Sequence, residues 1–154
     1  PANPARGVPL AQRAAGIEER LRRLAGITDQ ITPAVLAAWE AALAAPAATT
    51  RTWLHGDLHP RNVLVDAGRI SGIIDWGDLT AGDSATDLAA IWMLFEDPAE
   101  RAAAWEAYGE AAPALQARAA GWAVILGALL LDTGLVDHPA HARIGERTLR
   151  RLGG

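Results

Sequence analysis

Residues 53–78 read WLHGDLHPRNVLVDAGRISGIIDWGD, and this stretch decides how the rest of the chain is interpreted. It contains two short runs of β-branched and apolar residues, 62–66 and 70–75. The sequence Asp-Ala-Gly-Arg at 66–69 separates them and is typical of a turn between antiparallel strands. The stretch therefore predicts a β-hairpin.

Three polar side chains on or before this hairpin suggest chemistry. With the turn centred between Gly68 and Arg69, Asn62 and Asp75 are about equally far from the centre, so we expect them to face each other. An amide oxygen beside a carboxylate forms a hard-oxygen site suited to Mg²⁺. Asp57 precedes the hairpin and is expected to lie close enough to accept a proton from a substrate hydroxyl.

The flanking sequence is rich in alanine and has the apolar spacing of helices. Pro33, Pro98, Pro113 and Pro139 each stand where a helix is expected to begin. The expected fold is α+β and mainly helical, with one short hairpin among about six helices.

The charge balance excludes several classes of function. The 14 basic residues are all arginine against 18 acidic ones, so the net charge is −4, the opposite of a nucleic-acid-binding domain. There is no cysteine, hence no disulfide framework. The longest apolar run, Ala119 to Leu131, is short for a bilayer and reads as a core helix. We expect a cytoplasmic protein with no nucleic-acid or membrane partner.

The catalytic-loop pattern of kinases, H-R-D-L-x-x-x-N, is matched by His55, Asp57, Leu58 and Asn62, with Gly56 in place of arginine. The sequence thus resembles the kinase superfamily at its catalytic loop.

Other features are similar to the aminoglycoside phosphotransferase family of small-molecule kinases. The first is Asp75-Trp76-Gly77, which stands in place of D-F-G. The others are the later stretch 82–89, the segment Arg6–Leu10, the pair Trp53-Leu54 and the triplet Gly121-Trp122-Ala123. The resemblance implies a protein-kinase-like C-terminal lobe. We therefore expect three segments in the chain. Residues 1–52 form a helical segment of this lobe, residues 53–88 carry the catalytic loop, the hairpin and the metal motif, and residues 89–154 form the helical remainder.

The resemblance also implies roles for individual residues. Asp57 would be the catalytic base, while Asn62 and Asp75 would hold the Mg²⁺ that bridges the phosphates of ATP. His59 is expected to touch the transferring phosphoryl group, and Asp78 to line the acceptor site.

A second set of residues is expected to support the loop. His55 is predicted to pack beneath it, and Asp83 and Asp87 to cap a helix and brace it. The partner expected for the whole site is a small hydroxylated molecule, with the acidic balance favouring a cationic one such as an aminoglycoside.

A complete kinase of this kind carries a strand lysine and a glycine-rich phosphate loop, and this sequence has neither. The expectation is therefore that the N-terminal nucleotide lobe is absent and that the chain alone is inactive or nearly so. The surface left by that lobe is expected to favour self-association.

Two alternatives remain open at this level. His55-x-Asp57-x-His59 places three ligand-type side chains at alternate positions, as in a metal hydrolase. The chain could also be a non-catalytic binding remnant of such a kinase.

Overall fold

The computed structural model describes residues 3–109 and 112–154. Within these residues it contains seven α-helices and two separate two-stranded antiparallel sheets, which confirms the α+β, mainly helical class. In chain order the elements are η1 (Leu10–Gln12), α1 (Ala14–Ala25), α2 (Pro33–Ala44), β1 (Thr52–Leu54), η2 (Pro60–Asn62), β2 (Val63–Asp66), β3 (Arg69–Ile73), η3 (Trp76–Asp78), β4 (Thr80–Gly82), α3 (Ala85–Leu88), α4 (Ala90–Leu94), α5 (Pro98–Tyr108), α6 (Pro113–Gly134) and α7 (Pro139–Arg151), where η denotes a 3₁₀ helix.

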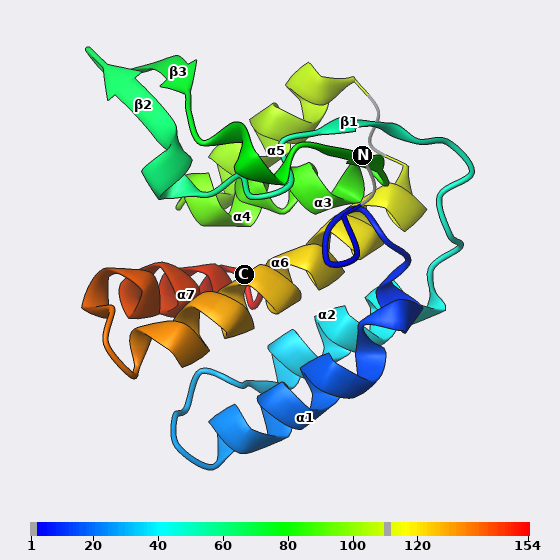
Figure 1. Cartoon of the computed structure of the whole chain (residues 1–154), viewed down its shortest axis with the longest axis vertical. Coiled ribbons are helices and arrows are strands. Elements are labelled where there is room, and N and C mark those ends of the chain that lie inside the picture. Colours follow the sequence, from blue (N-terminus) through cyan, green and yellow to red (C-terminus); the bar gives the residue numbers. More distant parts are fainter. Residues whose placement is uncertain (1–2, 110–111) are drawn as a thin grey trace.

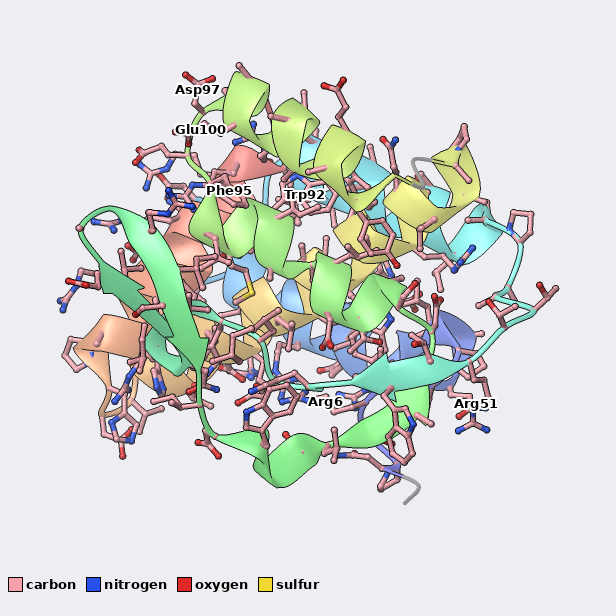
Figure 2. All side chains as sticks on the ribbon, turned by 90° about the horizontal axis from the view of Figure 1, so that it is seen from above. Arg6, Arg51, Trp92, Phe95, Asp97 and Glu100 are labelled. Carbon is pink, nitrogen blue, oxygen red and sulfur yellow. The ribbon has the colours of Figure 1, made fainter. Side chains whose placement is uncertain are left out.

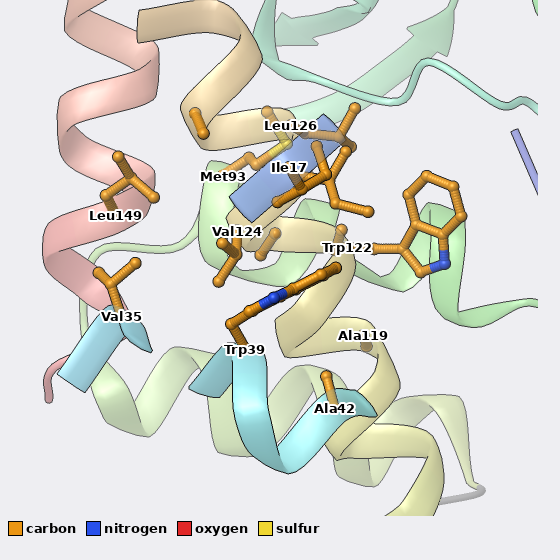
Figure 3. Packing of buried hydrophobic residues seen from close by; sticks show 14 of the residues in the cluster. Ile17, Val35, Trp39, Ala42, Met93, Ala119, Trp122, Val124, Leu126 and Leu149 are labelled. Atoms are coloured by element: carbon orange, nitrogen blue, oxygen red, sulfur yellow. The ribbon is translucent and has the colours of Figure 1, made fainter. Parts of the chain in front are cut away.

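Helix α6 forms the centre of the molecule. Helix α7 runs along it on one side and α1 and α2 on another, while the catalytic segment lies across its third side (Figure 1). The Trp122 and Leu131 side chains of α6 are fully buried, and Trp39 and Ala42 point from α2 toward it (Figure 3). A Cβ atom at Gly145 of α7 would lie 2.5 Å from the Leu131 backbone nitrogen, so glycine allows α6 and α7 to pack closely.

Helix α6 also has the length and hydropathy of a membrane-crossing helix. Of its most apolar window, 67% is buried inside the fold. Such burial is typical of a core helix, which is how its apolar run was interpreted from the sequence.

Helix starts follow the proline and capping pattern. The Thr32 side chain accepts a hydrogen bond from the Val35 backbone N–H at 3.3 Å, directly before Pro33. Asp97 does the same for Ala99 at 2.8 Å at the start of α5. These caps fix where α2 and α5 begin.

The expected hairpin is present as β2 and β3, but its register differs from the prediction. The turn residues Ala67 and Gly68 both have positive φ angles, 47° and 75°, so the turn is centred between them. A register shift between Leu64 and Val65 moves the pairing back by one residue toward the predicted one. The Asn62 carbonyl consequently accepts a hydrogen bond from the Ile74 N–H at 2.9 Å, and the predicted pairing of Asn62 with Asp75 is wrong by one residue.

A second strand pair, β1 with β4, was not expected from the sequence. Leu54 lies opposite Thr80 in this sheet, at the entrance to the catalytic loop. Residues 3–9, here called the N-terminal strap, pack against β4 (Figure 1). A Cβ atom at Gly82 would lie 2.5 Å from the Gly7 Cα, and the Asp83 N–H donates to the Gly7 carbonyl at 3.3 Å. The strap is thus held beside the segment that carries Asp57.

Candidate active site

The Asp57 carboxylate is held from two sides. Its Oδ1 is 3.1 Å from Nη2 of Arg6, and its Oδ2 is 3.3 Å from Nε2 of His59. The His59 hydrogen bond lowers the pKa of Asp57 more than any other cause, with smaller contributions from the charges of His59 and Arg6, while partial burial opposes the shift. Asp57 is therefore ionised at neutral pH, as an acceptor of a hydroxyl proton must be.

The imidazole of His59 is largely buried, and both of its nitrogens face a partner. Its Nδ1 accepts a hydrogen bond from the Arg61 N–H at 3.3 Å. In the neutral ring the proton then sits on Nε2, the nitrogen that faces Asp57. His59 accordingly positions the Asp57 carboxylate, and its predicted contact with a phosphoryl group stays a prediction.

His55 ties the catalytic loop to the end of the hairpin. Its Nδ1 accepts from the Asp57 N–H at 3.2 Å, and its Nε2 lies 2.8 Å from the Ile74 carbonyl, to which it donates. Its ring also packs against Trp76, with the ring centres 4.7 Å apart. The residue before Asp75 and the backbone of Asp57 are thereby held by one buried side chain.

Asp87 of α3 braces the same loop from below. Its carboxylate accepts from the backbone N–H groups of His55 at 2.6 Å and Gly56 at 2.9 Å. Burial raises the pKa of Asp87, while these two hydrogen bonds favour the carboxylate and oppose the rise. Gly56 has a φ of 85°, and a Cβ there would lie 2.5 Å from the Asp78 carbonyl oxygen, so the loop requires glycine at this position.

Asp83 anchors the start of α3 to α6. Its Oδ2 lies 2.6 Å from Nε of Arg118, and its Oδ1 accepts from the Ala85 N–H at 3.1 Å. Asp83 therefore contacts the scaffold of the site and not the Asp57 carboxylate.

Asp78 of η3 is linked to Asp57 through Arg6. Its Oδ2 is 3.5 Å from Nε of Arg6, and its Oδ1 accepts from the Asn3 side-chain nitrogen at 3.1 Å. The Arg6 side chain is only 11% exposed and lies where the N-terminal strap passes β1 and η3 (Figure 2). One buried guanidinium thus joins the two carboxylates.

Asn62 and Asp75 differ in how firmly they are held. The Asn62 side-chain nitrogen donates to the Asp57 carbonyl at 2.9 Å, which turns its amide oxygen away from that bond. Asp75 is exposed and has a left-handed backbone, with φ 61° and ψ 65°. This conformation is uncommon for residues other than glycine and is frequent at functional sites.

The model of the phosphotransferase enzyme family matches residues 2–122, which include every residue of the site described above. The chain belongs to this phosphotransferase family.

The chain is similar to individual proteins over part of their length. The uncharacterized protein YcbJ of Bacillus subtilis (strain 168) is 31% identical over 94 residues, covering 55% of this chain and 30% of YcbJ. A macrolide 2'-phosphotransferase type I has a TM-score of 0.48 and 24% identity, and an apo thermostable mutant of aminoglycoside phosphotransferase APH(4)-Ia has 0.45 and 22%. Both cover 91% of this chain, which spans 55% and 52% of their lengths.

Arg6 is a site residue of this phosphotransferase-family chain that the sequence interpretation missed. The segment Arg6–Leu10 was noted only for its resemblance to relatives, because 51 residues separate Arg6 from Asp57. No short motif spans that distance, so the link emerges only when the strap packs on β4.

The residues present fit a magnesium ion. Among the described residues, no group of three His, Cys, Asp or Glu side chains forms a metal site by itself. Asn62 and Asp75 offer an amide and a carboxylate oxygen, and Mg²⁺ in enzymes is commonly bound by one or two such ligands together with water and substrate phosphates. The donor set of this phosphotransferase-family chain is therefore of the kind that holds Mg²⁺ only together with a phosphorylated substrate.

Proposed function

We propose that this chain carries the base and metal ligands of an ATP- and Mg²⁺-dependent phosphotransferase that transfers the γ-phosphoryl group to a substrate hydroxyl. One observation carries the proposal. The carboxylate of Asp57 is kept ionised, and the backbone carbonyl of the same residue accepts a hydrogen bond from the Asn62 side chain, so the proposed base and a proposed metal ligand are held together.

In the proposed reaction, Asp57 orients the acceptor hydroxyl and takes its proton as the oxygen–phosphorus bond forms and the bond from phosphorus to ADP breaks. When bound, Mg²⁺ neutralises negative charge on the phosphates. Asn62 and Asp75 would hold it, and His55 keeps the strand end before Asp75 in place relative to Asp57. Phosphoryl transfer depends mainly on such positioning.

The acceptor is proposed to be a small hydroxylated molecule. Asp78 supports a place for it next to Asp57, because Arg6 joins the two carboxylates. The named structural relatives are phosphotransferases of macrolides and aminoglycosides, so both classes belong in a first screen.

A metal hydrolase is disfavoured by the position of His55. Both of its ring nitrogens are used by backbone groups, Asp57 N–H and Ile74 carbonyl, so neither is available to a metal ion. The alternative of a non-catalytic remnant is tested by the experiment below. It is supported if Mn²⁺ and ATP together cause no broadening at Asn62 and Asp75.

The metal half of the proposal is tested with Mn²⁺ in place of Mg²⁺ during nuclear magnetic resonance of the whole chain. In the presence of ATP, paramagnetic broadening is expected first at Asn62 and Asp75. Asp75→Asn should reduce this broadening strongly, because it removes the only formal charge of the pair. The matched variant Asp66→Asn, on the exposed hairpin turn, should leave it unchanged. Broadening centred elsewhere in the chain contradicts the proposed site.

The base is tested by phosphotransfer from labelled ATP to a panel of hydroxylated acceptors. We expect slow transfer by this chain, since it contains no lysine to pair with the nucleotide phosphates. Asp57→Asn should lower the rate by about 10²- to 10⁴-fold, the usual contribution of a general base. A rate that is unchanged in Asp57→Asn refutes the role of Asp57.

A further inference from the structure

A cavity of about 570 Å³ lies between the N-terminal strap, the end of α2, the linker of residues 45–51 and β4. This volume is within the usual range for small-molecule sites, roughly 300–1,000 Å³. Most of its wall is apolar, with contributions from Val8, Leu10, Ala42, Leu43 and Ala48. The cavity thus has the size and the surface to hold the body of an organic ligand.

The charged groups in the wall are mostly positive. Among the residues that the structure describes, Arg6, Arg51 and Arg118 line the cavity, and Asp83 is the single acidic residue in the lining. That carboxylate is already paired with Arg118 at 2.6 Å. Arg6 is likewise paired with Asp57 and Asp78, so among the described residues Arg51 is the one charged group of the lining without a carboxylate partner. A polycationic ligand would therefore meet the positive charge of Arg51 and no unpaired carboxylate in the wall.

Arg6 connects the cavity with the Asp57 carboxylate. Neither Asp57 nor Asp78 is part of the cavity wall, yet Arg6 belongs to the wall and lies 3.1 Å from Oδ1 of Asp57. The Nε atom of Arg6 is buried and donates no hydrogen bond to any described residue, although Oδ2 of Asp78 is 3.5 Å away. A buried N–H without an acceptor can be satisfied by an oxygen atom of a ligand.

We propose that this cavity holds the body of the acceptor, and that the acceptor is a largely apolar, neutral alcohol and not a polycation. Arg6 stands at the junction, where it faces an acceptor oxygen on one side and Asp57 on the other. The inference rests on the proposed phosphotransferase function. It replaces the cationic acceptor that the net charge of the whole chain had favoured. The charges that line a site, and not the net charge of the chain, determine which ligand charge the site accepts.

The test measures binding to the whole chain without nucleotide, by calorimetry, using naphthalenemethanol as a neutral apolar alcohol and kanamycin as a polycation. Ala48→Trp fills the cavity from a half-buried position, and Ala37→Trp makes the same change on an exposed position of α2 outside it. We expect Ala48→Trp to weaken naphthalenemethanol binding by about tenfold or more and Ala37→Trp to leave it unchanged. Equal affinities in the two variants overturn the assignment of the cavity.

A second variant keeps the cavity open and changes only its charge. Arg51→Glu is expected to leave naphthalenemethanol binding within about twofold and to raise kanamycin affinity several-fold. If kanamycin binds the unmodified chain and displaces naphthalenemethanol, the proposed selectivity is wrong.

Nuclear magnetic resonance of the chain with isotope-labelled aspartate tests whether a ligand in the cavity affects the Asp57 carboxylate. The Asp57 resonance is the one that is absent in Asp57→Asn. Naphthalenemethanol should shift this resonance in the unmodified chain and not in Ala48→Trp. Binding without any shift would show that the cavity does not serve Asp57. These outcomes are independent of phosphotransfer, so a rate unaffected by Asp57→Asn would refute the proposed function without deciding on the cavity.

Discussion

The core around α6 and the catalytic segment of residues 53–78 use the same kinds of apolar side chain in opposite ways. Trp122 and Leu131 of α6 are fully buried. In the catalytic segment Trp53 is 65% exposed, Val65 64% and Trp76 52%. The core is therefore stabilised by apolar burial, whereas the catalytic segment is held in place chiefly by hydrogen bonds and ion pairs.

The sharpest test of this contrast is one substitution made in both regions. Trp122→Ala should lower the free energy of unfolding by about 3–5 kcal/mol, because it removes a fully buried indole and leaves a cavity in the core. Trp53→Ala, on the exposed side of β1, should change it by less than about 0.5 kcal/mol. Urea unfolding of the two variants measures both values. Similar losses in both would mean that the catalytic segment is also stabilised by apolar packing.

A smaller effect is expected where the catalytic segment is joined to the core. Asp87→Ala leaves the backbone N–H groups of His55 and Gly56 without their acceptor and should cost about 1–3 kcal/mol. Hydrogen exchange should accelerate at these two amides, and urea unfolding gives the loss of stability.

The matched control for Asp87→Ala is Asp66→Ala, which removes an exposed carboxylate from the hairpin turn. It should leave both measurements unchanged. If the amides of His55 and Gly56 stay protected in Asp87→Ala, the loop does not depend on this carboxylate.

The same contrast separates what the sequence could predict from what it could not. Helices with periodic apolar residues and capped starts, such as α2 after Thr32, follow from local rules. The hairpin also followed from its turn residues. Its register did not, because the shift between Leu64 and Val65 depends on how the two strands meet and not on composition.

The candidate site shows a similar limit. Asp57 and Asn62 were placed close together by a five-residue spacing, and the structure joins them by a hydrogen bond. The contact of Arg6 with Asp57 and the strand pair β1–β4 depend on residues far apart in the sequence. Strands β1 and β4 are each three residues long, which is too short for an alternation of apolar and polar residues to be recognised in the sequence.

The smallest expected effect concerns how the Asp57 carboxylate is tuned. The hydrogen bond from His59 is the main cause of its lowered pKa, so His59→Phe should raise that pKa toward the ordinary value of 3.8. A titration of isotope-labelled Asp57 would show the midpoint at higher pH, and the acid limb of phosphotransfer should move in the same direction. His138→Phe, at an exposed histidine whose side chain contacts Asp137 and His141, should leave the midpoint unchanged.

The stability of the chain should follow the same sign. A carboxylate with a lowered pKa stabilises the folded state above its unfolded pKa, and this contribution is lost as the pH falls through the folded value. In His59→Phe the two pKa values lie closer together, so the loss between neutral and acidic pH that is due to Asp57 should be smaller than in the unmodified chain. A midpoint that stays in place or moves to lower pH would show that another group, with Arg6 the next to test, keeps Asp57 ionised.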